Sequence, residues 1–151
     1  ITMEALRKAD QRLRALRPDL RLMVMDATRP MSVQQVMWDA VKNTDKRIYV
    51  SNPKNGGGLH NYGLAVDVTL CRVNGDTLTM GVKIDNMTRL SHIDKEDELL
   101  KQGKISKEAY DNRRLLREVM QYGGFKPLRT EWWHFNIRTR SQAKQYFKVV
   151  R

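Results

Sequence analysis

Two short segments of the chain combine residue types that bind a divalent metal ion with residue types that activate water. The first runs from His60 to Asp67, and the second is Glu131-Trp-Trp-His134. Two histidines and one carboxylate leave a tetrahedral zinc ion with one open position, as in catalytic rather than structural zinc sites. Such an ion lowers the pKa of a bound water to about 7 and polarises the carbonyl under attack. The two segments therefore predict a metallohydrolase.

The spacing within each segment indicates how its side chains reach one ion. The seven-residue gap between His60 and Asp67 is too long for one helical turn, but it suits a loop residue followed by a strand residue. Glu131 and His134 are three residues apart, so a regular strand would place them on opposite faces. We therefore expect Glu131 at a turn just before the strand, where it can take a proton from water and pass it to the leaving amine.

A cation beside the attacked carbonyl would stabilise the oxyanion that forms there. Arg29 is the candidate, because it follows a predicted strand over residues 20–25 in which apolar residues alternate. Pro30 disfavours a helical conformation for Arg29, which places the arginine at the strand end.

Helical periodicity predicts three helices. The first covers residues 3–16 and ends before Pro18, the second begins at a capping box of Ser32 and Gln35, and the third is capped by Ser106 and closed by Gly123-Gly124. We expect their apolar positions to face the core. These positions are Met3, Leu6, Ala9, Leu13 and Leu16 in the first helix, Val33, Val36, Met37, Ala40 and Val41 in the second, and Ala109, Tyr110, Leu116, Val119 and Met120 in the third.

Alternating residues predict an antiparallel sheet. In the strand over residues 64–70 the apolar stripe takes one face and Asp67 the other. Asn74-Gly75 is a type I′ hairpin signal, with a returning strand over residues 77–80. In a strand over residues 132–137, His134 is expected to face the same cleft as Asp67. The tail over residues 143–150 fits a helix, and its last residues fit an edge strand equally well. The fold class predicted is α+β, with a central antiparallel sheet flanked by helices.

Composition bounds the remaining possibilities. With 151 residues the chain is expected to be a single domain, residues 1–151, and no apolar run approaches the roughly 20 residues of a membrane span. The net charge of +11 is scattered rather than clustered, which favours a solvated basic surface over a nucleic-acid-binding one. A single cysteine excludes an internal disulfide. The chain opens directly into a helical pattern, so we expect it to lack a native N-terminal segment. Its oligomeric state cannot be predicted.

Four separated segments resemble the zinc D-Ala-D-Ala metallopeptidases. Gly58-Leu-His60-Asn-Tyr-Gly-Leu-Ala-Val-Asp67 is similar to their Ser-x-His-x-x-Gly-x-Ala-x-Asp motif, and Glu131-Trp-Trp-His134 to their Glu-x-Trp-His motif. Asp26-Ala-Thr-Arg29-Pro30 resembles their Asp-Gly-Tyr-Arg-Pro segment. Asn112-Arg-Arg-Leu-Leu, with Gly124-Phe125, further resembles the VanX-type D-alanyl-D-alanine dipeptidases.

The resemblance implies a fold shared with these peptidases and with the Hedgehog signalling domain. It implies one Zn²⁺ per chain, with His60, Asp67 and His134 as its ligands. It also implies Glu131 as the general base and Arg29 as the group that stabilises the tetrahedral intermediate. Met80-Gly-Val-Lys-Ile-Asp85 is similar to the family's Met-Gly-x-x-Phe-Asp, whose aspartate is expected to bind the free ammonium of the dipeptide. The expected activity is hydrolysis of D-Ala-D-Ala in bacterial peptidoglycan turnover, in the cytoplasm or in the periplasm and cell envelope.

Two positions depart from the family pattern. Gly58 stands where the motif has serine, so the function of that hydroxyl is missing or is supplied elsewhere. Ile84 replaces the aromatic residue before Asp85. The family's dipeptidases also carry an N-terminal segment ahead of the first helix, which we expect this chain to lack. Without that segment the cleft could be open and admit longer cell-wall peptides, so a D,D- or L,D-carboxypeptidase stays an alternative. A non-catalytic zinc-binding module is the other, although the presence of both Glu131 and Arg29 argues against it.

Overall fold

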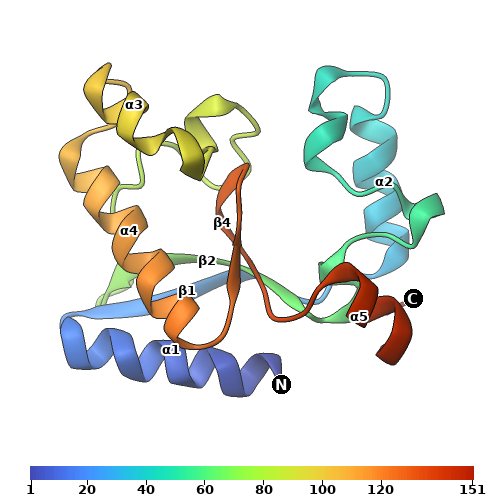
Figure 1. Ribbon diagram of the computed structural model, residues 1–151, viewed down its shortest axis with the longest axis horizontal. Helices are drawn as coiled ribbons and strands as arrows, with labels where there is room; N and C mark the ends of the chain where they lie inside the picture. The colour runs from blue at the N-terminus through green and yellow to red at the C-terminus, as the bar shows by residue number, and fades with distance from the viewer.

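The computed structural model describes residues 1–151 and has the α+β architecture that the sequence predicts. A four-stranded antiparallel sheet has the strand order β1-β2-β4-β3. Helices α1 and α4 pack against each other and against strands of this sheet (Figure 1). The strands are β1 (Leu20–Asp26), β2 (Ala65–Arg72), β3 (Lys126–Leu128) and β4 (Glu131–Asn136). The α-helices are α1 (Thr2–Leu16), α2 (Met31–Val41), α3 (Glu96–Lys101), α4 (Lys107–Tyr122) and α5 (Arg140–Tyr146).

Five short 3-10 helices join these elements. They are η1 (Asp45–Tyr49), η2 (Pro53–Asn55), η3 (Leu59–Tyr62), η4 (Arg89–Ser91) and η5 (Ile93–Lys95). None of the helices is both long and apolar enough to cross a membrane.

The main core lies between the sheet and the helix pair α1 and α4. Val66, Val68 and Leu70 of β2 are buried there together with Trp133 and Phe135 of β4. These are the alternate residues of each strand that the sequence pattern assigned to the core face. The side chains of Asp67 and His134 are thereby directed to the opposite side.

The buried face of helix α1 differs in part from the predicted one. Ala5, Ala9 and Leu13 are its buried residues, whereas Met3 and Leu16, which we expected in the core, are exposed. A Cβ added to Gly123, just beyond α4, would lie 2.5 Å from the backbone oxygen of Ala5 and 3.1 Å from the Cβ of Ala9. Small residues at this crossing therefore allow the backbones of the two helices to approach each other.

The predicted core face of α2 is wrong at three of its five positions. Val33, Val36 and Ala40 are exposed, with Val36 70% accessible, and Gln34 is the only buried residue of the helix. The inward-facing stripe consists of Gln34, Met37, Trp38 and Val41, about one residue around the helix from the prediction. Figure 1 shows why: α2 lies away from the α1–α4 layer, on the other side of β4. The predicted Ser32 cap is also absent, because Pro30 occupies the N-cap position.

The predicted hairpin after β2 forms only in part. The turn closes with a hydrogen bond from Gly75 N to Arg72 O, and Gly75 has a φ of +96°. The returning segment makes one isolated bridge, between Cys71 and Thr77, rather than a strand. Beyond this bridge, the returning segment is joined to β2 by hydrogen bonds from Arg72 N to Asp76 O and from Leu78 N to Leu70 O.

The tail, for which the sequence left two possibilities open, is helical only up to Tyr146, where α5 ends, and forms no edge strand after it. Phe147, which follows the helix, has an extended backbone. Val150 N donates to Asn61 O, and Met31 N donates to Val150 O. The tail therefore holds η3 and the start of α2 together.

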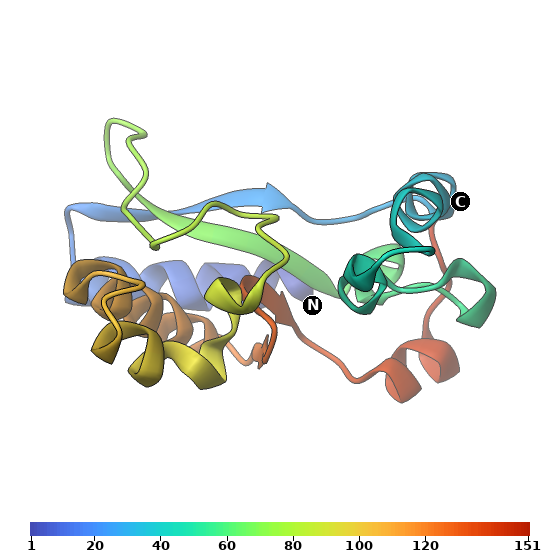
Figure 2. The ribbon, with the colours of Figure 1, turned by 90° about the horizontal axis from the view of Figure 1, so that it is seen from above.

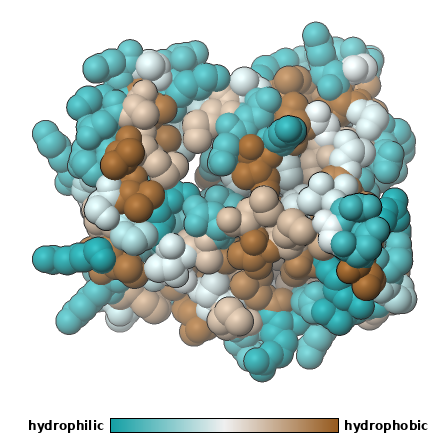
Figure 3. Space-filling model, turned by 180° about the vertical axis from the view of Figure 1, so that it is seen from behind, coloured by the Kyte–Doolittle hydropathy of each residue, from teal (hydrophilic) through white to brown (hydrophobic).

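Strand β1 forms one edge of the sheet, and its outer side is largely open (Figure 2). Val24 and Met25 of this strand are exposed. On the face seen from behind, apolar surface is interspersed with hydrophilic surface (Figure 3).

Candidate metal centre and active site

Cross-strand pairing brings two of the predicted metal ligands together. Asp67 of β2 lies directly opposite His134 of β4, and on its other side it pairs with Asp26 of β1. Directly paired residues of antiparallel strands have their side chains on the same face and only about 5 Å apart. The distance from Asp67 Oδ1 to His134 Nδ1 is 3.3 Å.

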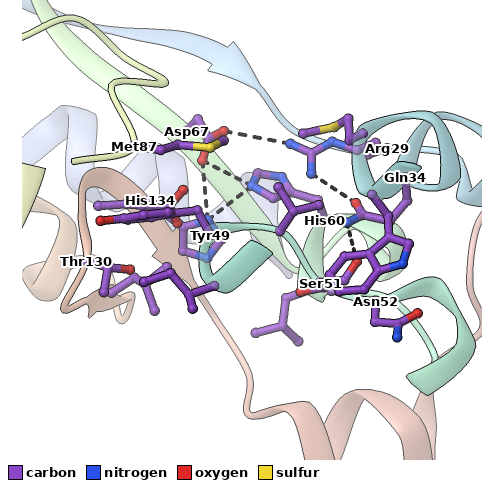
Figure 4. A pocket seen from close by; sticks show the side chains of 18 of the residues that line it. Arg29, Gln34, Tyr49, Ser51, Asn52, His60, Asp67, Met87, Thr130 and His134 are labelled. Atoms are coloured by element: carbon purple, nitrogen blue, oxygen red, sulfur yellow. Dashed lines mark hydrogen bonds and ion pairs between the residues drawn. The ribbon is translucent and has the colours of Figure 1, made fainter. Parts of the chain in front are cut away.

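His60 completes the group from outside the sheet. It lies in η3, which ends at Gly63 in the left-handed conformation, with a φ of +69° that favours glycine. Its Nε2 is 3.0 Å from Asp67 Oδ1 and 3.1 Å from His134 Nδ1. Figure 4 shows the three side chains converging on one point. The structure therefore brings together the histidine, aspartate and histidine that the sequence singled out, in an arrangement able to hold a metal.

The hydrogen bonding of His60 fits a cation at this point. His60 Nδ1 is 2.7 Å from the carbonyl oxygen of Ala27, which can only accept, so Nδ1 carries the proton. His60 Nε2 faces the Asp67 carboxylate and the His134 ring, and it donates a hydrogen bond to them only when it too carries a proton. Three acceptor atoms facing one another repel unless a proton or a metal ion lies between them. Neighbouring ligands of a tetrahedral zinc ion are roughly 3.3–3.6 Å apart, only slightly more than the observed separations.

Burial and charge act on the pKa values of these groups. Burial alone would raise the pKa of Asp67, but hydrogen bonds with His134 and His60 outweigh it and lower the pKa to about 2. Burial lowers the pKa of His134, which favours the neutral imidazole that binds metals. Asp67 is therefore ionised and His134 tends to stay neutral, as a metal site requires.

Glu131 lies at the start of β4, immediately after the turn at Arg129 and Thr130. We expected it at the turn itself, so it is placed slightly later than predicted. An irregularity in the β3–β4 register, between Pro127 and Leu128, occurs beside it. Glu131 lines the same cleft as His134. Burial first, and then the charges of Asp67 and Asp85, raise the pKa of Glu131 to about 8.

Arg29 is fixed by two side-chain contacts. Its Nη2 is 2.6 Å from Asp26 Oδ2, and its Nη1 donates to Gln34 Oε1 at 3.1 Å. The guanidinium lies 4.0 Å from Asp67 Oδ2, beside the metal-binding group rather than within it. A cation held in this position can stabilise negative charge that develops in the cleft.

Asp85 has an unusual backbone. Its φ of +68° makes it the only non-glycine residue in the left-handed region. Such conformations cost about 1–3 kcal/mol and persist where surrounding structure enforces them. Burial, followed by the charge of Asp67, raises the pKa of Asp85.

All six predicted site residues line one cleft of about 440 Å³. These residues are Arg29, His60, Asp67, Asp85, Glu131 and His134. The volume lies within the range of small-molecule sites. Two contacts cross the cleft from η1: Tyr49 OH bonds His92 Nε2 at 2.8 Å, and Lys46 Nζ donates to Met87 O at 2.6 Å.

Sequence reasoning missed the residues that position the site. Gln34 joins Arg29 to the carbonyl of Ser51, and the Asn61 side chain donates to the carbonyl of Arg29 at 2.8 Å. Tyr49 and His92 are likewise not among the predicted site residues. The one available signal was Gln34 itself, a polar residue whose helical neighbours Met37, Trp38 and Val41 are all apolar.

Comparison with known proteins agrees with the family resemblance of the sequence motifs. Residues 2–151 match the model of the peptidase M15 family, described as D-ala-D-ala dipeptidase. The chain is 33% identical over 127 residues to the D-alanyl-D-alanine dipeptidase of Escherichia coli (strain K12), covering 84% of this chain and 58% of that protein. It is 35% identical over 89 residues to that of Enterococcus faecium, covering 58% of this chain and 41% of the other. The chain thus spans about half the length of the curated relatives it matches.

Proposed function

This chain belongs to the peptidase M15 family of D-ala-D-ala dipeptidases, and from that premise we propose that it is a zinc-dependent dipeptidase that hydrolyses D-Ala-D-Ala to D-alanine. The proposal includes a role in bacterial peptidoglycan turnover and residues 1–151 as one catalytic unit. The observation that carries it is the convergence of three metal-ligand atoms within 4.8 Å of one another, in the same cleft as a buried glutamate and a fixed arginine.

Each side chain has a distinct role in this proposal. His60, Asp67 and His134 hold the metal, which when bound acts as a Lewis acid on the scissile carbonyl and makes water more acidic. Glu131 accepts the proton of the attacking water and transfers it to the leaving amine. The peptide bond breaks and one water is consumed, giving two molecules of D-alanine.

Arg29 and Asp85 act on the substrate's charges. The Arg29 guanidinium, held by Asp26 and Gln34, stabilises the negative charge that develops on the carbonyl oxygen. Asp85 binds the free ammonium of the dipeptide by a charge-assisted hydrogen bond. A dipeptidase working in this way requires an unblocked amino terminus.

D-alanine release from D-Ala-D-Ala and from its N-acetylated form tests the proposal. Both reactions are run before and after chelation, and again after zinc is added back. We expect chelator-sensitive cleavage of the free dipeptide only. Absence of cleavage of either peptide despite bound zinc would overturn the dipeptidase and favour a non-catalytic zinc-binding module.

One observation favours carboxypeptidase activity on longer peptides as a second candidate. Asp85 lines the cleft and two neighbouring cavities, both formed in part by Met25 and Ile84. Cavities therefore lie on more than one side of the proposed ammonium partner. Cleavage of the N-acetylated peptide at a rate comparable to the free one would support this D,D- or L,D-carboxypeptidase assignment instead.

A further inference from the structure

The backbone at Gly58 does not explain why this residue is a glycine. Its φ of −114° and ψ of 179° lie in the extended region that any residue adopts. A Cβ at this position, however, would lie 2.7 Å from Ser51 Oγ and 3.2 Å from Ser51 Cβ. The Ser51 side chain therefore already fills the space that a side chain at position 58 would occupy.

The Ser51 backbone is held in place, and the Ser51 hydroxyl has no hydrogen-bond partner within the protein. The carbonyl of Ser51 accepts a hydrogen bond from Gln34 Nε2 at 2.8 Å, which fixes the backbone beside Arg29 (Figure 4). None of the protein's hydrogen bonds involves Ser51 Oγ, and both Ser51 and Gly58 line the cleft. The hydroxyl is thus available to a ligand.

The surroundings of Ser51 suit a negatively charged group. Arg140 lines this part of the cleft, and its Nη2 donates to Gly57 O at 2.5 Å but makes no ion pair. Asn52, next in the chain, also lines the cleft. In the view of Figure 4, Ser51 and Asn52 lie on the other side of His60 from Asp67. The guanidinium therefore contributes a positive charge that no carboxylate neutralises.

We propose that the Ser51 hydroxyl binds the terminal carboxylate of the substrate, in a subsite formed with the Gly57–Gly58 loop and Arg140. This inference rests on the proposed function. When the ammonium is at Asp85 and the scissile carbonyl at the metal-binding group, the carboxylate extends away from Asp85. Ser51 then supplies, from a different segment, the hydroxyl that position 58 lacks.

The first test compares the S51A variant with the parent on two substrates, D-Ala-D-Ala and the same dipeptide with its carboxylate capped as a primary amide. A hydrogen bond to a charged group corresponds to roughly a 10- to 100-fold change. We expect S51A to lower kcat/KM for the free acid by about tenfold or more, and to change that for the amide much less. A purely structural role would lower both substrates alike and would overturn the proposal.

A side-chain exchange supplies the matched control. G58S alone places a Cβ against Ser51 and should lose activity. S51G/G58S removes that contact and returns a hydroxyl to nearly the same place, so we expect it to recover most of the preference for the free acid. S51G/G58A fills the same space without the hydroxyl and should not recover it. If both double variants recovered the preference equally, the side chain of Ser51 would only fill space, and the proposal would be overturned.

Failure of this inference is distinguishable from failure of the dipeptidase proposal. If the zinc-loaded parent released no D-alanine, the dipeptidase would fail, and calorimetry with the uncleaved acid and amide would measure the same preference as a binding ratio. If the ratio of the affinity for the acid to that for the amide is lower in S51A than in the parent, the subsite would still be supported. A parent that binds neither ligand would overturn it.

Discussion

Glu131 has an environment that a surface glutamate lacks, because it is buried beside two other carboxylates. These surroundings raise its pKa to about 8. A positive charge at the neighbouring His60, Asp67 and His134 would favour the ionised form and lower this pKa toward the neutral range in which a general base works. The protonation state of Glu131 thus depends both on whether a metal ion is bound and on pH.

Replacing Glu131 should separate metal binding from turnover. We expect E131A to keep the metal content of the parent and to lose about 10²- to 10⁴-fold in kcat, since a positioned base contributes that much. H134A should lose both metal and activity. Metal analysis of the purified variants beside D-alanine release checks this, and an E131A variant with parental turnover would exclude Glu131 as the base.

The raised pKa of Glu131 also predicts how the metal-free protein responds to pH. Below pH 4.5 the carboxyl is protonated in both folded and unfolded chains. Between pH 4.5 and about 8 only the unfolded chain ionises, so the stability contributed by the neutral buried form is lost as pH rises. The variant E131Q has no such group.

The measurement is urea unfolding of the chelated parent and E131Q at pH 5 and pH 8. We expect the free energies of unfolding to be close at pH 5, with E131Q becoming the more stable by roughly 2–4 kcal/mol at pH 8. A difference independent of pH would show that the pKa of Glu131 is not raised in the folded state.

At the scale of elements, one buried arginine fixes the loop that carries Asp85. Arg113 of α4 donates from Nε to Met80 O at 2.7 Å and from Nη2 to Leu90 O at 2.8 Å, at the two ends of that loop. Its charge is balanced by buried Glu96, 3.6 Å away. A single side chain of the neighbouring helix therefore holds both ends of this loop.

R113K keeps the charge but cannot form both hydrogen bonds in the same geometry. We expect it to lose roughly 1–3 kcal/mol of unfolding free energy, because a buried carbonyl is left without a partner. R114K, at the exposed neighbouring position, should stay within about 0.5 kcal/mol of the parent. Denaturant unfolding of the two variants decides the matter, and equal effects would mean that the contacts of Arg113 do not hold the loop.

At the scale of the whole molecule, the metal-binding group joins parts that are distant in the chain. His60 comes from η3, Asp67 from β2 and His134 from β4, and the C-terminal tail bonds to Asn61 within η3. An ion bound by all three elements stabilises the folded chain, because the unfolded chain does not present these ligands together.

Zinc should therefore raise the thermal stability of the protein. At a free zinc concentration 100-fold above the dissociation constant, we expect the unfolding free energy to increase by about 2.7 kcal/mol. H60A should show little of this increase, because it lacks one of the three ligands. Calorimetric scans of the chelated and zinc-loaded proteins measure it, and an equal shift in H60A would place the zinc elsewhere.

The sequence by itself determined the family, the fold class and the residues around which the cleft is built. Alternation placed Asp67 and His134 on the opposite face from the core stripes, because successive strand residues point to opposite sides whatever the partner strand is. The cap at Ser106 and the end of the first helix before Pro18 are likewise local properties of the chain. Both are found in the structure.

Tertiary structure decided what each face packs against. Periodicity identifies an apolar stripe on α2 but not its neighbour, so Val36 is exposed while Gln34 is buried against Arg29 and the Ser51 carbonyl. The Ser51 side chain fills the space where Gly58 would carry a Cβ, and Tyr49 forms a hydrogen bond with His92. No local sequence pattern encodes either arrangement. Such contacts depend on the path of the whole chain, because side-chain packing and burial are settled only when all the elements are in place.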